Sequence, residues 1–312
     1  MAIDLRGRPI AITGASSGIG AATAVECARA GMPVALGARR IDKLEAVVGR
    51  IREEGGRAIA VPMDVAEPAQ CEALVDAAVS EFGSLYAVYA NAGYGVEKPV
   101  HEMTNEEIRV MFEINFFGTL NIIRPALAHM RAAPAAHTSG PRGHVLICSS
   151  CLGKMFLPYF SVYSATKAAQ SHIGRAMRLE LRHEGVEVST VHPISTRTEF
   201  FDMAEKLSGQ GTLIAHSPDF MVQTAEFVAR RTVACLRRPR AEVWTGLRGQ
   251  FVKFGMSVCT LVPALADMSL AGMVKRRLGH YPRSDAAVGE TSSGAGGAGG
   301  AGGAGGAGGA GG

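Results

Sequence analysis

The fold of this chain is decided by the stretch Ile10-Ala11-Ile12-Thr13-Gly14-Ala15-Ser16-Ser17-Gly18-Ile19-Gly20, in which a short apolar run ends in a glycine-rich turn. Strong helix formers follow over residues 21–30, so the stretch predicts a strand, a turn and a helix in that order. Glycines let the backbone turn tightly and approach a pyrophosphate, whose charge is stabilised by the free N–H groups of a helix N-terminus. A dinucleotide site is therefore expected here, with an ordinary tight turn as the alternative.

A second buried strand is expected over residues 33–37, and it ends in Ala38-Arg39-Arg40. An NAD site usually presents an acidic residue at this point to the ribose 2′-hydroxyl, whereas a guanidinium group binds a 2′-phosphate in a bidentate manner. The pattern favours NADP(H), with Arg39 as the main contact and Ser16 or Ser17 as a helper. The alternative is that both arginines only solvate the start of the next helix.

Strands and helices continue to alternate along the chain, which predicts an α/β fold with a Rossmann-like, doubly wound parallel sheet. The expected strand order is 3-2-1-4-5-6-7, with helices on both faces. Helices are expected at 41–54, 68–82, 106–130, 162–184 and 224–237, and further strands at 57–61, 86–90, 144–148, 186–191 and 241–244.

Polar residues stand at the carboxyl ends of these strands, where ligands lie in an open parallel sheet. Asp64 follows the third strand, and it could accept a hydrogen bond from an adenine amino group or cap the helix that begins near Pro68. Asn91-Ala92-Gly93 follows the fourth strand. His192 ends the sixth strand beside Pro193, and we interpret it as a packed residue rather than a base.

Tyr163 and Lys167 stand four residues apart in the first turns of a predicted helix, so their side chains share one helical face. A nearby ammonium group lowers the pKa of a phenol by stabilising the phenolate, which would allow Tyr163 to exchange a proton in catalysis. Ser150 stands 13 residues before Tyr163, at the end of the fifth strand. Asn115 lies among apolar residues within the long helix at 106–130, where a hydrogen-bonded core amide is the alternative to a functional role.

The order of these motifs resembles the short-chain dehydrogenase/reductase family over roughly residues 6 to 245. The resemblance implies that Asn115, Ser150, Tyr163 and Lys167 are catalytic. Ser150 would bind the substrate carbonyl oxygen, Tyr163 would pass a proton to it, Lys167 would hold the nicotinamide ribose and lower the phenol pKa, and Asn115 would position a water. The predicted cofactor contacts are Thr13, Gly14, Ser16, Ser17, Gly18, Ile19, Gly20, Arg39, Arg40, Asp64, Val65, Asn91, Ala92, Gly93, Tyr163, Lys167, Pro193, Thr196 and Thr198.

One position departs from the family pattern. The family usually has glycine after Pro193, and this chain has Ile194, which makes the loop geometry beside the nicotinamide uncertain. The region after it, over residues 199–223, is rich in apolar side chains such as Phe200 and Met203, which would line the pocket of an apolar substrate or pack on their own sheet.

We expect a catalytic domain at 1–250 that includes the substrate loop at 199–223, an apolar helical extension at 251–283 and a disordered Gly/Ala-rich tail at 284–312. Residues 251–274 are mostly apolar and precede Lys275-Arg276-Arg277. Pro263 and Asp267 argue against a membrane span. A membrane-surface helix pair over residues 251–280, a lid and an oligomer contact stay open.

The net charge is +4, from 32 basic and 28 acidic residues, which is too balanced to indicate a nucleic-acid partner. The six cysteines are scattered, so free thiols are expected, and no metal site is predicted. The start of the chain carries no secretory signal, which predicts a cytoplasmic protein, with membrane association as an open alternative. A homo-oligomer, either a dimer or a tetramer, is also expected.

Together these features predict an NADP(H)-dependent oxidoreductase that interconverts a ketone or aldehyde and an alcohol on an apolar substrate. Two alternatives remain. One is a reductase of 3-oxoacyl thioesters, and the other is a non-catalytic nucleotide-binding module associated with a membrane or a partner. The intact residues Ser150, Tyr163 and Lys167 argue against the non-catalytic module.

Overall fold

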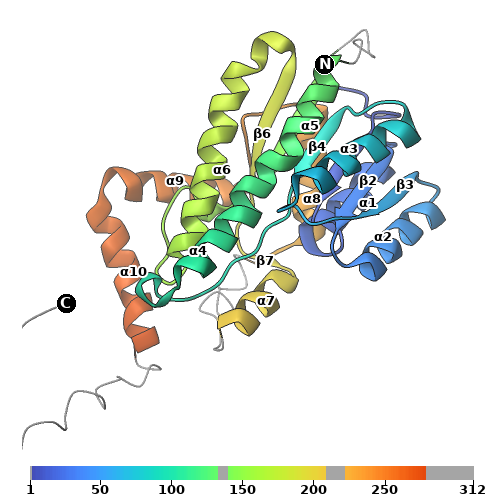
Figure 1. The fold of residues 1–312 in the computed structure, drawn as a ribbon. Coiled ribbons are helices and arrows are strands. Elements are labelled where there is room, and N and C mark those ends of the chain that lie inside the picture. The colour runs from blue at the N-terminus through green and yellow to red at the C-terminus, as the bar shows by residue number, and fades with distance from the viewer. Residues whose placement is uncertain (1, 133–139, 209–221, 279–312) are drawn as a thin grey trace, which may run out of the picture.

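A seven-stranded sheet forms the centre of the molecule in the computed structural model, which describes residues 2–132, 140–208 and 222–278 (Figure 1). All its strand pairs are parallel, and the order β3-β2-β1-β4-β5-β6-β9 confirms the predicted topology. The bounds are β1 Ile10–Thr13, β2 Val34–Ala38, β3 Ala58–Pro62, β4 Ala87–Ala90, β5 Gly143–Cys148, β6 Val186–His192 and β9 Glu242–Trp244. The order reverses between the neighbours β1 and β4, and ligands of such sheets bind at this point.

Helices cover both faces of the sheet, which explains why its strands are continuous apolar runs. The core on one face joins the sheet to α1 (Gly18–Arg29), α2 (Ile41–Glu53) and α8 (Ala225–Arg237). The core on the other face joins it to α3 (Pro68–Phe82), α5 (Gly118–Ala132) and the start of the segment that follows α6 (Ser161–Glu180). The six cysteines are free thiols, as predicted.

The prediction of one continuous helix over residues 106–130 is wrong in one respect, because the observed helix is interrupted. It consists of α4 (Asn105–Phe112), the π-helical segment η2 (Glu113–Phe117) and α5. The chain that precedes them contains a short turn, η1 (Val100–Glu102). A π-helical segment adds a residue to one turn and changes which side chains face the core, so it often lies at a functional site.

Three smaller differences separate the predicted and observed elements. The helix expected at 162–184 ends at Glu180, and the 3₁₀ turn η4 (Arg182–Glu184) follows it before Gly185 takes up a left-handed φ of 73°. A further 3₁₀ turn, η3 (Cys151–Gly153), follows β5. The substrate region contains α7 (Glu199–Ser208) and a small parallel pair of strands, β7 (Thr196–Arg197) and β8 (Gln223–Thr224).

The chain beyond the sheet forms two helices, α9 (Gly246–Leu261) and α10 (Pro263–Leu278). Among the described helices, none is long and apolar enough to cross a membrane alone. Residues Gly249–Leu261 and Pro263–Gly272 meet that test only as a pair, and the pair is bent by 115°. Pro263 therefore does not interrupt a helix but begins one, a position that suits its fixed φ and missing N–H. The predicted tail at 284–312 lies outside the described residues.

Candidate active site

The glycine-rich turn connects β1 to α1 at the carboxyl end of the sheet. Gly14 has a φ of 66°, which L-residues with side chains rarely adopt. A Cβ atom added to Gly20 would lie 2.4 Å from the carbonyl oxygen of Gly14, so only glycine fits at this close approach. Ile19 lies in the first turn of α1 and packs against the core. The turn thus leaves the N-terminus of α1 accessible to an anion, as a dinucleotide site requires.

Asn91 and Thr13 fasten this turn to β4, the neighbouring strand at the switch point. The Oγ1 atom of Thr13 accepts hydrogen bonds from the main-chain N–H groups of Asn91 and Ala92, both at 3.1 Å. The Nδ2 atom of Asn91 donates to the carbonyl oxygen of Thr13 at 3.0 Å. The two motifs that the sequence predicts for cofactor binding are therefore parts of one hydrogen-bonded unit.

Arg40 brings the two serines of the turn together with the loop that follows β2. Its Nη2 atom donates to Ser17 Oγ at 2.7 Å and to Ser16 Oγ at 3.2 Å, and its Nη1 atom donates to Glu199 at 2.7 Å. Hydrogen bonds from Lys43 and Arg40 lower the pKa of Glu199 to about 2. Arg40 therefore does more than solvate the start of α2.

Arg39 lies on the same edge but is held less tightly. Its guanidinium group approaches Asp64 only to 3.5 Å, and 69% of its side chain is exposed. Asp64 does not cap α3, because the N-cap is Glu67 and the Asp64 carboxylate instead accepts from the N–H of Ala66 at 3.0 Å. The helix-cap alternative is therefore wrong, and Arg39 keeps the freedom to contact a ligand.

The main chain at Val65 links the third strand to the helix that follows the π-helical segment. Its carbonyl oxygen accepts a hydrogen bond from Asn121 Nδ2 at 2.9 Å, and its side chain lies against Gly118. Val65 thus holds its place through contacts to α5, while Asp64 beside it stays partly exposed.

Ser150 lies directly after β5 and begins η3. Its backbone is extended, and its hydroxyl accepts a hydrogen bond from the N–H of Leu152 at 3.1 Å. The hydroxyl also donates a long hydrogen bond to Cys151 Sγ at 4.0 Å, a weak acceptor that a substrate oxygen could replace.

Tyr163 lies in the first turn of α6, as predicted, and only 8% of it is exposed. Burial raises the pKa of Tyr163 far above its ordinary value, and the hydrogen bond with Ser150 offsets this only in part. The phenol pKa is thus raised on balance and not lowered as expected, because desolvation of the phenolate outweighs the effects that favour it. The phenol is therefore a protonated group at neutral pH.

Lys167 projects from the same face of α6 as Tyr163. Its Nζ atom donates to the carbonyl oxygen of Cys148 at 2.8 Å and lies 5.6 Å from the centre of the Tyr163 ring. Burial lowers the pKa of Lys167 to about 8. Gly93 lies opposite, and a Cβ atom added there would be 3.4 Å from the ammonium nitrogen.

Asn115 lies within the π-helical segment and is fully buried. Its side chain exchanges hydrogen bonds of 2.9 Å with the main chain of Tyr94 and donates to Thr166 Oγ1 at 3.0 Å. The main-chain carbonyl oxygen of Asn115 accepts hydrogen bonds from Gln170 Nε2 at 2.6 Å and from Thr119 Oγ1 at 2.8 Å. Asn115 thus joins the π-helical segment to α6, the helix that carries Tyr163 and Lys167.

The loop after β6 closes the site from the other side. The carbonyl oxygen of Pro193 accepts a hydrogen bond from the N–H of Cys151, which places it next to Ser150. Thr196 Oγ1 bonds to the carbonyl oxygen of Ile194 at 2.7 Å, and Thr198 lies against Gly18. Ile194 is buried and does not have a positive φ, so the loop accepts isoleucine without backbone strain.

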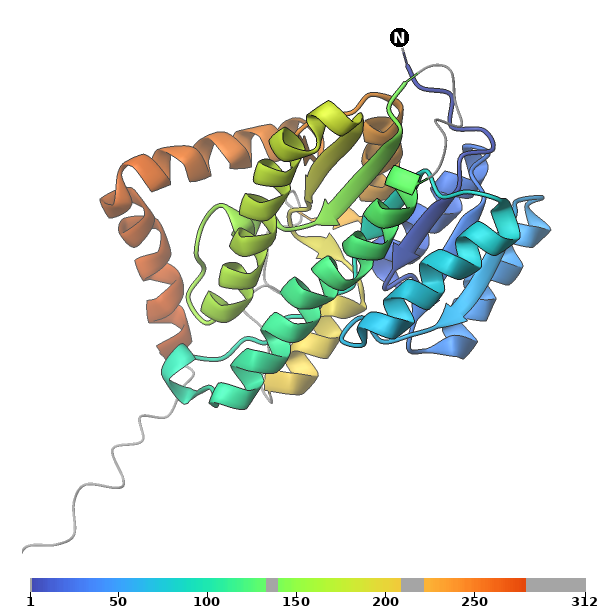
Figure 2. The same ribbon diagram turned by 45° about the horizontal axis from the view of Figure 1, so that its top comes forward.

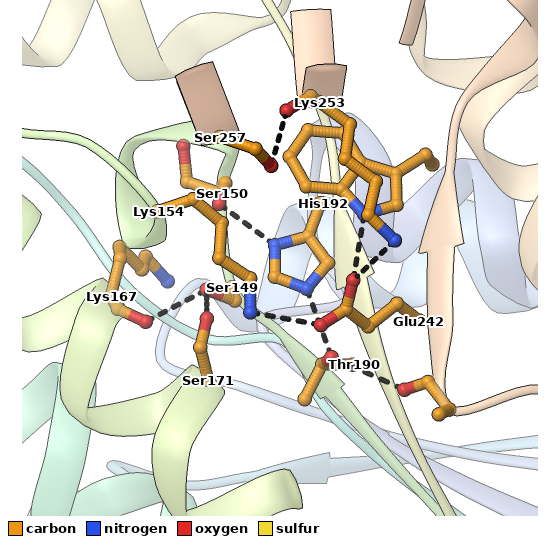
Figure 3. A network of polar contacts seen from close by, with 12 residues as sticks. Ser149, Ser150, Lys154, Lys167, Ser171, Thr190, His192, Glu242, Lys253 and Ser257 are labelled. Carbon is orange, nitrogen blue, oxygen red and sulfur yellow. Dashed lines mark hydrogen bonds and ion pairs between the residues drawn. The ribbon is translucent and has the colours of Figure 1, made fainter. Parts of the chain in front are cut away.

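A polar network behind Ser150 was not predicted from the sequence (Figure 3). His192 is buried, and its Nδ1 atom lies 3.0 Å from the carbonyl oxygen of Ser150. The Trp244 ring stacks on the imidazole with a centroid distance of 4.8 Å and an interplanar angle of 7°. Glu242 receives hydrogen bonds from Trp244 Nε1 at 3.0 Å and from Lys154 at 2.8 Å. In the sequence, the only signal for this network was the expected pairing of the last two strands, which places His192 at the end of β6 opposite Trp244 at the end of β9.

The substrate side of Tyr163 is apolar. Its ring contacts Phe160 and Phe200, with centroid distances of 6.2 Å and 5.3 Å. A buried cluster around it includes Leu157 and, from α10, Leu270. Met203 and Leu207 of α7 are 44% and 51% exposed, and residues 209–221 of the predicted substrate loop lie outside the described part of the chain.

Comparison with known proteins places this geometry in a family. The short chain dehydrogenase family model matches residues 8–208. An uncharacterized oxidoreductase of Listeria innocua is 34% identical over 212 residues, which cover 67% of this chain and 83% of the relative.

Solved structures give the same result. A short chain dehydrogenase/reductase from Burkholderia phymatum in complex with NAD has a TM-score of 0.71 and 25% identity, and the match covers 83% of this chain and 96% of the other. A short chain dehydrogenase from Burkholderia cenocepacia in complex with NADP has a TM-score of 0.66 and 26% identity, with coverage of 77% and 98%. The chain therefore belongs to the short chain dehydrogenase family.

Proposed function

We propose that this protein is an NADP(H)-dependent oxidoreductase that interconverts a ketone or aldehyde and the corresponding alcohol on an apolar substrate. The observation that carries the proposal is the buried, protonated phenol of Tyr163, which lies beside Ser150 and Lys167 and faces an apolar cluster. A protonated acid held next to a hydroxyl donor suits the reduction of a carbonyl group.

The residues of the site fit a nicotinamide dinucleotide. Gly14 and Gly20 pack so closely against Ala92 and the Gly14 carbonyl that only glycine fits, which forms the tight turn before α1 that a pyrophosphate site needs. Lys167 projects towards Gly93 at the carboxyl end of β4. When bound, the nicotinamide would donate or accept a hydride. Complexes of two family members, one with NAD and one with NADP, support this class of cofactor.

Residues at the end of β2 favour NADP(H) within that class. Ala38 stands where an acidic residue would contact a 2′-hydroxyl, and it is buried. Arg39 is exposed beside it. Arg40, the next residue, donates hydrogen bonds to the hydroxyls of Ser16 and Ser17. Two guanidinium groups and two hydroxyls form a suitable environment for a 2′-phosphate.

The chain's own groups account for the proton transfer. Ser150 donates a hydrogen bond to the carbonyl oxygen and holds it near Tyr163, whose hydroxyl gives its proton as negative charge develops on that oxygen. The product alcohol has gained one hydride and one proton. Lys167 carries an ammonium group beside the phenol, and its charge stabilises the phenolate that remains. Oxidation of an alcohol uses the same groups in reverse.

A reductase of 3-oxoacyl thioesters is the nearest competitor, and a cluster of unpaired basic residues at the site would favour it by attracting an acidic carrier protein. Among the described residues near Ser150, Lys154 and Lys253 both form ion pairs with Glu242. These two lysines therefore do not form such a cluster, and the apolar cluster around Tyr163 favours a free apolar substrate.

A panel of apolar ketones and aldehydes tested for NADPH consumption by the purified protein would test the proposal. We expect turnover of at least one class, and much tighter binding of NADPH than of NADH. Nucleotide binding without turnover of any carbonyl or alcohol would support a non-catalytic module instead. Equal affinity for the two nucleotides would contradict the assignment of the cofactor.

A further inference from the structure

The helices α9 and α10 form an arm that extends from the edge of the sheet at β9 and turns back along the molecule (Figure 2). We call these two helices the C-terminal arm. Large apolar side chains on it are 42% to 82% exposed, namely Phe251, Phe254, Leu261, Val262, Leu265 and Met268. Such a concentration on two consecutive helices marks an interaction surface.

Only a small part of the arm packs on the catalytic domain. Ala266 and Leu270 of α10 are buried, and Leu270 belongs to the cluster that contains Tyr163. On α9, the exposed apolar residues Phe251, Phe254 and Leu261 lie within about 80° of one another around the helix axis and so form one face. A helix with one exposed apolar face suits the boundary between the headgroups and the acyl chains of a bilayer.

Charge identifies the occupant of this surface. The arm carries five basic residues and one acidic residue between positions 246 and 278, and it ends with Lys275-Arg276-Arg277. A second copy of the arm would bring the same excess of positive charge, whereas the surface of a bilayer with anionic lipids is complementary to it. The bend of 115° also allows both helices to lie near one plane instead of crossing the bilayer.

We propose that the C-terminal arm lies in the interface of an anionic lipid bilayer, with Phe251, Phe254 and Leu261 among the acyl chains. Leu270 joins the inner side of the same arm to the cluster around Tyr163. Delivery of an apolar substrate from the bilayer to the site follows only if the proposed function holds, but the membrane contact itself does not depend on it.

Flotation of the full-length protein with lipid vesicles tests the contact. The protein should float with vesicles of phosphatidylcholine mixed with phosphatidylglycerol. The triple substitution Phe251→Ser, Phe254→Ser and Leu261→Ser should lower the bound fraction at least about tenfold. The control is Leu179→Ser, which removes a side chain that is 72% exposed on α6 and should leave binding unchanged.

A charge substitution distinguishes binding to the lipid headgroups from insertion among the acyl chains. Lys275→Glu should weaken binding to the anionic vesicles by roughly fivefold and leave the weaker binding to pure phosphatidylcholine unchanged. Absence of flotation, or flotation that the triple substitution does not alter, would overturn the proposal. Conversion of a dimer to a monomer by the triple substitution, measured by sedimentation without lipid, would assign the surface to a second copy and also overturn it. None of these readouts requires catalytic turnover.

A second inference rests on His192, a residue of β6 that does not face the substrate cluster. Its Nδ1 atom lies 3.0 Å from the carbonyl oxygen of Ser150, and its Nε2 atom lies 2.9 Å from Thr190 Oγ1. A carbonyl oxygen can only accept, so Nδ1 carries the proton. Thr190 Oγ1 then donates to Nε2 of the neutral ring at 2.9 Å and not to the more distant carbonyl oxygen of Ala241 at 3.3 Å. Burial lowers the pKa of His192 to about 4, which keeps the ring neutral.

We infer that His192 is a positioning residue that fixes the main chain of Ser150, and thereby the direction of its hydroxyl. The bond acts on the residue that donates to the substrate, and the Trp244 ring, which stacks parallel to the imidazole, limits the rotation of that ring. Glu242 accepts from Trp244 Nε1 and so fixes that ring in turn. The role of Ser150 in turnover rests on the proposed function.

Two substitutions separate the contributions of the two ring nitrogens of His192. The amide nitrogen of His192→Asn can replace Nδ1 and donate to Ser150, whereas the amide of His192→Gln reaches the position of Nε2 and leaves the Ser150 carbonyl without this donor. We expect kcat of His192→Gln to fall about tenfold, with little change in the KM for NADPH, and kcat of His192→Asn to stay at least about fivefold higher than that of His192→Gln.

The NADPH dissociation constant and the melting temperature of both variants provide the controls. Loss of kcat to the same extent in both variants, or loss in proportion to the melting temperature, would show a merely structural role and overturn the inference. If neither variant nor the parent protein turns over any substrate while all bind NADPH, the proposed function has failed. Crystal structures of the variants then decide the inference, because His192→Gln must displace the Ser150 carbonyl and His192→Asn must not.

Discussion

The nucleotide side and the substrate side of this molecule are held together by different kinds of contact. On the nucleotide side, Thr13 and Asn91 bind the main chain of neighbouring strand ends, and Gly20 fits against a carbonyl oxygen. On the substrate side, Phe200 contacts the ring of Tyr163, and α10 adds a single leucine to the apolar cluster. Main-chain contacts demand particular residues at fixed spacing, whereas apolar contacts accept many side chains of similar volume.

The largest expected effect lies where the two sides meet, at Tyr163. Tyr163→Phe should lower kcat about 10³-fold, because it removes only the proton donor, and NADPH affinity should stay unchanged. Steady-state kinetics and a fluorescence titration of NADPH provide the two measurements. Full activity of the variant would show that the proton comes from another group.

The nucleotide side can be broken by one methyl group. Gly20→Ala places a Cβ atom 2.4 Å from a carbonyl oxygen, and the free energy of unfolding should fall by roughly 3 kcal/mol, with loss of NADPH binding. Gly49→Ala is the matched control, since no atom lies within 4 Å of a Cβ at that helical position, and it should be neutral or stabilising by roughly 0.5–1 kcal/mol. Equal denaturation midpoints for the two variants would contradict the close packing of the turn.

Acid should destabilise the protein through histidines buried beside the sheet. Burial lowers the pKa of His144 to about 3 and that of His192 to about 4, so between pH 6.5 and 4.5 the unfolded chain binds protons that the folded chain does not. Stability should therefore fall as the pH falls through this window, by roughly 2 kcal/mol for each histidine. Urea unfolding at several pH values measures the slope, and His144→Gln should reduce it by about half. An unchanged slope would show that His144 is not responsible.

The smallest expected effect concerns the choice between nucleotides. Arg39→Asp should shift the preference towards NADH by at least about tenfold, since it replaces a phosphate-binding group by a carboxylate that accepts from a ribose hydroxyl. Arg50→Asp provides a control, because Arg50 is an exposed arginine on α2 that pairs with Glu54. If Arg40→Asp causes the larger shift, Arg40 and not Arg39 is the main contact.

The sequence predicted the sheet and the glycine-rich turn between β1 and α1 well, because these depend on local patterns. Strand, turn and helix at Thr13 to Gly20 follow from short-range propensity, and a parallel sheet follows from repetition of that unit. The family resemblance implied an irregularity of the helix at Asn115, but the local sequence could not give its bounds, since they depend on bonds from Gln170 and Tyr94, which are distant in the sequence.

The pKa shifts in the site could also not be predicted from the sequence. The spacing of Tyr163 and Lys167 predicted a lowered phenol pKa, but burial depends on surrounding elements and reverses the direction. The link between Glu199 and Arg40 joins residues 159 positions apart, and no local pattern announces it. Long-range packing therefore decides what a correctly predicted motif does chemically.

One carboxylate has a consequence for how this protein could be re-engineered. Glu242 binds Lys154, which lies four residues after Ser150, and also Lys253, which belongs to the C-terminal arm. Hydrogen bonds from these lysines and from Trp244 outweigh the effect of partial burial and hold the pKa of Glu242 well below its usual range. A truncated or chimeric protein without the arm would therefore lose one of the three groups that hold this carboxylate and would keep Lys154 and Trp244 as its partners.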